Sequence, residues 1–136
     1  LMDTGGNCGA QSSTMIIRGL ALDEIRVKDV LKVIFKEVGI ALMVGVVLVL
    51  ANIIRIKVMY GSEPVMAQLM IVVGLTLMCT VIIAKVLGAS LPILAKACHL
   101  DPAMMAAPII TTIVDMCTVM IYFGLATKLM EIIPGT

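Results

Sequence analysis

Apolar residues occur in long, almost uncharged blocks along this chain. The blocks predict three membrane-spanning helices, at residues 38–57, 65–87 and 103–130. At a rise of 1.5 Å per residue, their uncharged or nearly uncharged cores reach roughly 26, 30 and 38 Å, whereas the hydrocarbon core of a bilayer is about 30 Å thick. All three can therefore cross a membrane.

The first 37 residues follow a different pattern. Residues 1–22 combine glycines, hydroxyl side chains and a short apolar run, which predicts part of a helix whose outer portion is interrupted or absent. Non-helical backbone at that depth is stable only where protein or a water-filled cavity surrounds it. Residues 23–37 are amphipathic and charged, with most acidic residues early and the lysines late, as the helix dipole favours. This second stretch is expected to lie at the membrane interface.

Composition excludes most other protein classes. Of the 136 residues, 61% are hydrophobic and only 14% are charged, and the mean hydropathy is +1.15. A soluble domain of this size would need roughly 25–35% charged residues on its surface, and disordered or disulfide-framework chains are also excluded. The net charge is +1 and the basic residues are dispersed, so the chain lacks the clustered positive charge that nucleic-acid binding requires. The expected fold class is all-α, a polytopic transmembrane helix bundle.

Basic residues indicate the orientation of the bundle. Seven of them fall on the side of the 23–37 segment and three on the other side. The first group is Arg18, Arg26, Lys28, Lys32, Lys36, Lys85 and Lys96, and the second is Arg55, Lys57 and Lys128. The positive-inside rule then places the 23–37 segment in the cytoplasm and the C-terminus outside, in the inner (plasma) membrane.

The four cysteines show no spacing typical of a metal site or a redox motif. They are interpreted as small packing residues, which is how free cysteine usually behaves. A zinc site at Cys98, His99 and Asp101 would need a fourth ligand from elsewhere.

Asp115 separates this sequence from a generic helix bundle, because it lies at the centre of the third predicted span. An ionised Asp near the bilayer midplane costs at least about 2.5–3.5 kcal/mol on insertion scales, so it should face protein, water or a cation. The structural alternative is a neutral carboxyl that is hydrogen-bonded by a nearby threonine or paired with a lysine of another helix.

The neighbours of Asp115 predict a lined path for a cation. Helical spacing places Ala107, Thr111 and Thr118 on one narrow stripe with it. Pro108 is expected inside this helix, where it would leave the carbonyl of Met104 without its helical partner. The alternative is a seam of small residues used for close helix packing.

Three other polar residues, two within the apolar blocks and one just before the first block, have simpler interpretations. Asn52 and Gln68 are expected to form hydrogen bonds between helices. Glu37 would either concentrate cations at the cytoplasmic entrance or neutralise Lys36 or Arg18.

Oxygen ligands limit the choice of ion. Carboxylate, hydroxyl and carbonyl oxygens favour hard cations, and Mg²⁺ keeps several of its waters while binding through one or two carboxylates. One Asp115 from each of two chains would match a divalent charge.

Several segments, taken together and in order, resemble the MgtE-type magnesium channels. They are GGNCGAQSST at residues 5–14, running on to residues 16–21, FKEVG at 35–39, DPA at 101–103, and residues 108–115 and 121–123. The resemblance implies five transmembrane helices per subunit, of which this chain holds helices two to five and begins within helix two. It also implies a homodimer with the pore on the two-fold axis, and cytoplasmic Mg²⁺-sensing domains that are absent from this chain.

The resemblance further implies site residues. The pore carboxylate of the family falls on Asp115, and Ala107 and Thr111 fall on positions that approach the hydrated ion. Asn7 and Gln11 lie in the helix-two signature. Some relatives carry Asn at the positions of Ala107 and Ala10, so backbone carbonyls are the safer ligands there. The expected pore lining comprises Asn7, Gln11, Met104, Pro108 and Thr118.

These observations support a dimeric channel that passes largely hydrated Mg²⁺ down its gradient, with a second copy, the bilayer and divalent cations as partners. One alternative is a cation-coupled carrier in which Asp115 binds a proton and a metal in turn. Another is a membrane assembly module without transport. Enzymatic motifs such as GxxxxGK[ST] and GxSxG do not occur in the sequence.

Overall fold

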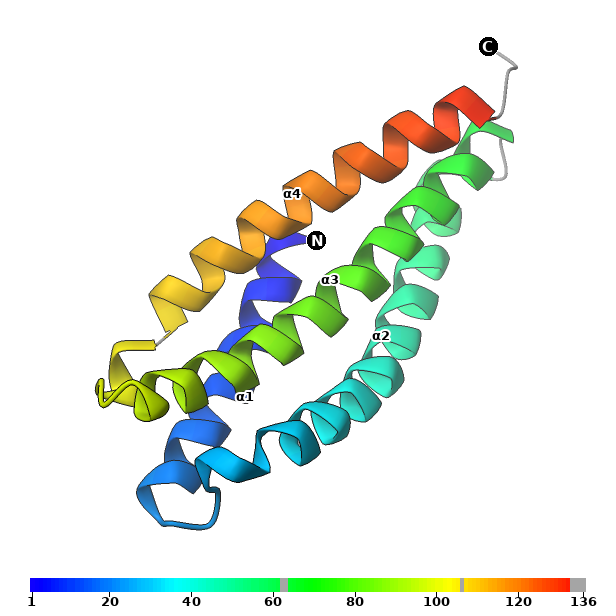
Figure 1. Cartoon of the computed structure of the whole chain (residues 1–136). Coiled ribbons are helices and arrows are strands. Elements are labelled where there is room, and N and C mark those ends of the chain that lie inside the picture. Colours follow the sequence, from blue (N-terminus) through cyan, green and yellow to red (C-terminus); the bar gives the residue numbers. More distant parts are fainter. Residues whose placement is uncertain (62–63, 106, 133–136) are drawn as a thin grey trace.

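Four long helices make up the fold. The computed structural model describes residues 1–61, 64–105 and 107–132 (Figure 1), and the helices within these ranges are α1 (Met2–Ala21), α2 (Val30–Tyr60), α3 (Pro64–Ala97) and α4 (Ala107–Ile132). Short 3₁₀ turns, η1 (Val27–Asp29) and η2 (Pro102–Met105), precede α2 and α4. The all-α prediction is confirmed.

Three of these helices are long and apolar enough to cross a membrane. Among the described residues the qualifying stretches are Val27–Tyr60, Ala67–Ala97 and Ala107–Lys128. They coincide with the apolar blocks of the sequence. Residues 30–37, which belong to the segment expected at the membrane interface, continue directly into α2 as one helix.

Helix α3 is the centre of the bundle and contacts α1, α2 and α4. Helix α1 packs against both α3 and α4, and its first residues lie beside the middle of α4 (Figure 1). The main core joins all four helices, with Cys8 of α1, Ala41 of α2, Val81 of α3 and Val114 of α4 buried together. The arrangement leaves one long side of α4 uncovered within the single chain.

Helix α1 is continuous through its glycines, so no interruption lies within it, and the alternative of an absent outer portion stays a prediction. The glycines lie where α1 meets its neighbours. A methyl group on Gly5 would collide with Thr80 and Val114, and one on Gly9 would lie 2.8 Å from a side-chain carbon of Ile110. Close packing of the backbones therefore compensates for the low helix propensity of glycine, as small residues do in membrane helices.

Pro108 is also placed differently from the expectation. Helix α4 begins at Ala107, so Pro108 lies in the first turn, and Met104 belongs to η2. In a first turn the missing N–H of proline would have had no helical partner anyway. Pro108 therefore starts the helix and does not free a carbonyl inside it. The proline inside a helix is Pro92 of α3.

The turn after α1 is held by Lys96. The backbone of Asp23 is left-handed, with φ of 56°, and the Nζ of Lys96 donates a 2.8 Å hydrogen bond to the carbonyl oxygen of Leu20. A cation at this position also offsets the negative end of the helix dipole of α1. This contact joins the end of α1 to the end of α3.

The tightest backbone contact joins α1 and α3, and it gives a direct test of the packing. The Cβ of an alanine at position 88 would collide with the carbonyl oxygen of Gly9. We expect Gly88→Ala to lower the free energy of unfolding by about 1–3 kcal/mol, because backbone atoms cannot rotate away as a side chain can. Thermal unfolding in detergent, followed by circular dichroism, measures the loss.

Gly39→Ala is the matched control, because nothing lies within 4 Å of a Cβ built at Gly39 of α2. That change should stabilise the protein by about 0.5–1 kcal/mol through helix propensity. Equal melting shifts in the two variants would contradict the close α1–α3 contact.

Candidate functional site

Asp115 lies in the middle of α4, on the side that the other helices of the chain leave uncovered. Its side chain is half-buried, and its Oδ1 is buried without a hydrogen-bond partner among the described residues. The ion pairs among the described residues are Lys85–Glu37 and Lys96–Asp23, so no lysine bridge holds Asp115 there. A buried carboxylate oxygen without a partner is costly, which indicates a ligand or partner that a single chain does not supply.

The surroundings of Asp115 are apolar and rich in methionine. The carboxylate borders a hollow of about 470 Å³ whose other lining residues are Met2, Thr112, Met116, Val119 and Met120. Met116 and Met120 are 64% and 74% exposed. This side of α4 is therefore an open apolar surface around one acidic group.

Hydroxyl and carbonyl oxygens continue the site toward the start of α4. Thr111 and Thr112 donate hydrogen bonds of 3.0 Å and 2.8 Å to the carbonyl oxygen of Pro108. Each threonine oxygen keeps its lone pairs as acceptors after donating its proton. Ala107 and Pro108 are exposed. The first turns of α4 thus present oxygen atoms but no further charge.

Helix α1 borders the same side of the molecule. Gly6 packs on Thr111, since a Cβ at Gly6 would lie 3.0 Å from the Thr111 methyl group. Asn7 and Gln11 are exposed on α1. The pore-lining role expected for Asn7 and Gln11 stays a prediction.

Asp3 was missed by the sequence analysis. Asp3 is exposed in the first turn of α1. With Leu1 and Met2 it lines a hollow whose other lining residues belong to α4, namely Thr118, Val119, Tyr122 and Phe123. The spacing of Asp3, Asn7 and Gln11 at intervals of four residues was the available signal, because such residues share one face of a helix.

Thr118 and Met104 are placed apart from this polar side. Thr118 is 2% exposed, donates to the carbonyl oxygen of Val114, and lies against Gly5 of α1. Its burial favours a packing role over the expected lining role. Met104 is 58% exposed in the turn before α4, so only its position near the helix start relates it to the site.

Glu37 forms a buried network that the sequence analysis did not anticipate. Its carboxylate accepts a 2.5 Å hydrogen bond from the Ser12 hydroxyl and lies 3.5 Å from the Nζ of Lys85. The network therefore ties α1, α2 and α3 together. Glu37 was expected either to concentrate cations or to neutralise Lys36 or Arg18. Both expectations are wrong, because its carboxylate forms an ion pair with Lys85.

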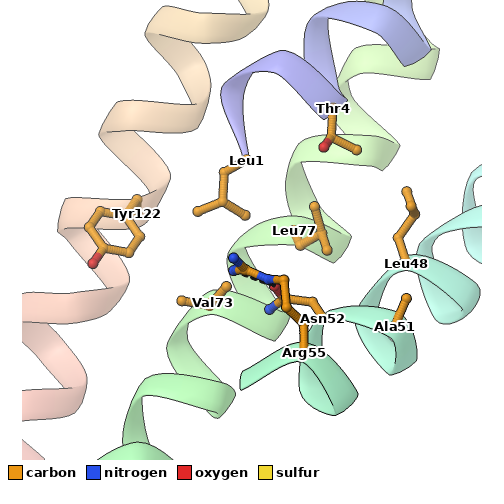
Figure 2. Close-up of a pocket in the computed structure, with 9 residues that line it drawn as sticks. All are labelled: Leu1, Thr4, Leu48, Ala51, Asn52, Arg55, Val73, Leu77 and Tyr122. Atoms are coloured by element: carbon orange, nitrogen blue, oxygen red, sulfur yellow. Dashed lines mark hydrogen bonds between the residues drawn. The ribbon is translucent and has the colours of Figure 1, made fainter. Parts of the chain in front are cut away.

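A third hollow, of about 530 Å³, is lined by Leu1 and Thr4 at the start of the chain and is shown in Figure 2. Arg55 and Asn52 of α2 face it, and Tyr122 of α4 lies on its opposite side. Arg55 donates two hydrogen bonds to the Oδ1 of Asn52, at 3.3 Å and 3.0 Å. Asn52 therefore bonds within its own helix and not between helices as expected. The guanidinium repels cations, so this hollow is no cation site.

The zinc hypothesis receives no support. Across the part of the chain that the structure describes, no three His, Cys, Asp or Glu side chains come together to hold a metal. The Oδ1 of Asp101 instead accepts a 2.9 Å hydrogen bond from the backbone N–H of Ala103.

Comparisons with known proteins identify the family of this chain. Residues 1–125 match the family model MgtE, described as a divalent cation transporter. The chain is 37% identical over 131 residues to the magnesium transporter MgtE of Thermus thermophilus, covering 96% of this chain and 28% of that protein. It is 37% identical over 123 residues to the magnesium transporter MgtE of Bacillus subtilis, covering 90% and 26%. The chain thus spans about a quarter of the length of these relatives, and it belongs to the MgtE family of divalent cation transporters.

Proposed function

We propose that this chain is the pore-forming part of a Mg²⁺ channel in the plasma membrane. The observation that carries the proposal is the carboxylate of Asp115, at the middle of a membrane-length helix, with one buried oxygen that has no partner within the described chain. A divalent cation with part of its water shell would satisfy that oxygen. The relatives named as magnesium transporters support Mg²⁺ as the transported ion.

The pore forms between two copies of the chain. A single Asp115 balances half of a divalent charge, and the open methionine-rich side of α4 is the surface that a second copy would cover. In such a homodimer the two Asp115 carboxylates face each other across a two-fold axis, and isologous contacts repeat the same residues from both sides. Thr111, the exposed Ala107 and Pro108, and Asn7 and Gln11 of α1 line the path next to them.

Membrane voltage supplies the driving force. An inside-negative potential favours entry by about 2.3 kcal/mol per elementary charge per 100 mV, so a divalent ion gains roughly twice that amount. No coupled ion is then needed. The competing function is a carrier in which Asp115 exchanges a proton for the metal.

Reconstitution separates these functions. The chain is inserted into liposomes that contain a Mg²⁺-sensitive dye or a pH-sensitive dye, and a K⁺ diffusion potential is set with valinomycin. We expect Mg²⁺ uptake that increases with inside-negative voltage and no accompanying proton efflux. Proton efflux in fixed proportion to Mg²⁺ would establish the carrier, and the absence of voltage-dependent Mg²⁺ uptake would refute the channel.

A further inference from the structure

Three lysines form an exposed line along the start of α2. Lys28, Lys32 and Lys36 are four residues apart, so they lie on one side of the helix and its preceding turn. We refer to these three residues as the basic stripe. Leu31 and Phe35 lie beside them and are 68% and 78% exposed. Positive charge and exposed apolar side chains are therefore adjacent.

Acidic residues near the basic stripe are engaged elsewhere. Glu37 pairs with Lys85 inside the bundle, the Oδ2 of Asp29 accepts the backbone N–H of Arg26, and Asp23 lies 3.8 Å from Lys96. Within residues 1–61, 64–105 and 107–132, no ion pair involves a lysine of the stripe. The three ammonium groups are therefore free of direct ion pairs within these residues.

The basic stripe continues into the outer apolar surface of α2. Met43 and Val47 follow Lys36 at helical spacing on the same side and are 67% and 65% exposed. Helix α2 has 31 residues, or about 46 Å at 1.5 Å per residue, which exceeds a hydrocarbon core of roughly 30 Å. When Met43 and Val47 contact acyl chains, the first turns of α2 therefore reach the headgroup layer.

We propose that the basic stripe binds the phosphate headgroups of anionic phospholipids. Lysine ammonium groups act as point charges on flexible stems, and the stems can lie along apolar surface while the charges reach the headgroups. Leu31 and Phe35 insert into the boundary between headgroups and acyl chains beside them. This property goes beyond ion conduction, because it assigns a lipid partner to the outer side of α2 and not to the pore.

Lipid selectivity tests the proposal without any ion flux. The chain is reconstituted in phosphatidylcholine vesicles with trace spin-labelled phosphatidylglycerol or phosphatidylcholine, in EDTA, and electron spin resonance measures the immobilised fraction of each lipid. We expect a preference for phosphatidylglycerol that falls at least about threefold in Lys28→Gln/Lys32→Gln/Lys36→Gln, since each juxtamembrane lysine is worth about 1 kcal/mol. Because all three side chains are exposed, the fold should be retained.

Two control variants sharpen the result. The triple Lys→Arg variant keeps the charge and should keep the preference. Arg55→Gln/Lys57→Gln/Lys128→Gln removes the same number of charges from the other end of the bundle and should change it less. Inorganic phosphate at 10 mM should not displace the labelled lipid. An unchanged preference in the Lys→Gln variant, or no preference in the unmodified chain, would overturn the proposal.

Discussion

Replacing Asp115 with asparagine is expected to reduce Mg²⁺ flux by more than about 100-fold. A divalent ion about 5 Å from a carboxylate, across one water layer, gains roughly 1.7 kcal/mol even at the dielectric constant of water, and two copies of Asp115 double that gain. Asparagine keeps the shape of the side chain and removes the charge. Initial rates of dye-reported Mg²⁺ uptake into liposomes measure the loss.

Asp23→Asn is the matched control, because it also removes one carboxylate from the chain. Asp23 is exposed in the turn after α1, and its left-handed backbone accepts asparagine readily. Its uptake rate should match that of the unmodified chain. Full Mg²⁺ flux in Asp115→Asn would show that the carboxylate is not needed for conduction, and it would contradict the proposed role of Asp115.

Replacing Glu37 with alanine is expected to lower the free energy of unfolding by about 3–5 kcal/mol. The change leaves the Lys85 ammonium buried without a counter-charge, and removing one partner of a buried ion pair has this effect. It also removes the acceptor of the Ser12 hydroxyl, so α1, α2 and α3 lose their shared contact. Unfolding of the purified chain by increasing SDS in mixed micelles measures the change.

A double variant distinguishes coupling from a general loss of packing. Glu37→Leu/Lys85→Met should recover at least half of the stability lost in Glu37→Ala, because a well-packed apolar pair can replace a buried ion pair. Glu24→Ala, at an exposed acidic residue, should unfold like the unmodified chain. If the separate losses of Glu37→Leu and Lys85→Met simply add in the double variant, Glu37 and Lys85 do not act as a pair.

The spans were predictable from the sequence because apolar blocks of membrane length leave few alternatives. The central position of Asp115 followed from the same blocks. The continuity of α1 was not predictable, because it depends on how closely Gly5 and Gly9 approach α3 and α4. Likewise, the Glu37–Lys85 pair joins residues from two helices, and no local pattern indicates it.

Thr118 shows the limit of reasoning from helical spacing. It follows Asp115 by three residues, which places the two side chains about 60° apart around the helix. Helix α1 covers Thr118, which is buried against Gly5, but it does not cover Asp115, which remains on the open side of α4. Spacing identifies a broad face, and only the neighbouring helix decides where that face divides.

The contact between Gly9 and Gly88 limits the motions available to the bundle. Because main-chain atoms of α1 and α3 touch there without intervening side chains, neither helix can rotate or slide past the other by changing rotamers. Farther along, the ammonium group of Lys96 fastens the last turn of α1 to α3 as well. We therefore expect α1 and α3 to move together in any conformational change of the bundle.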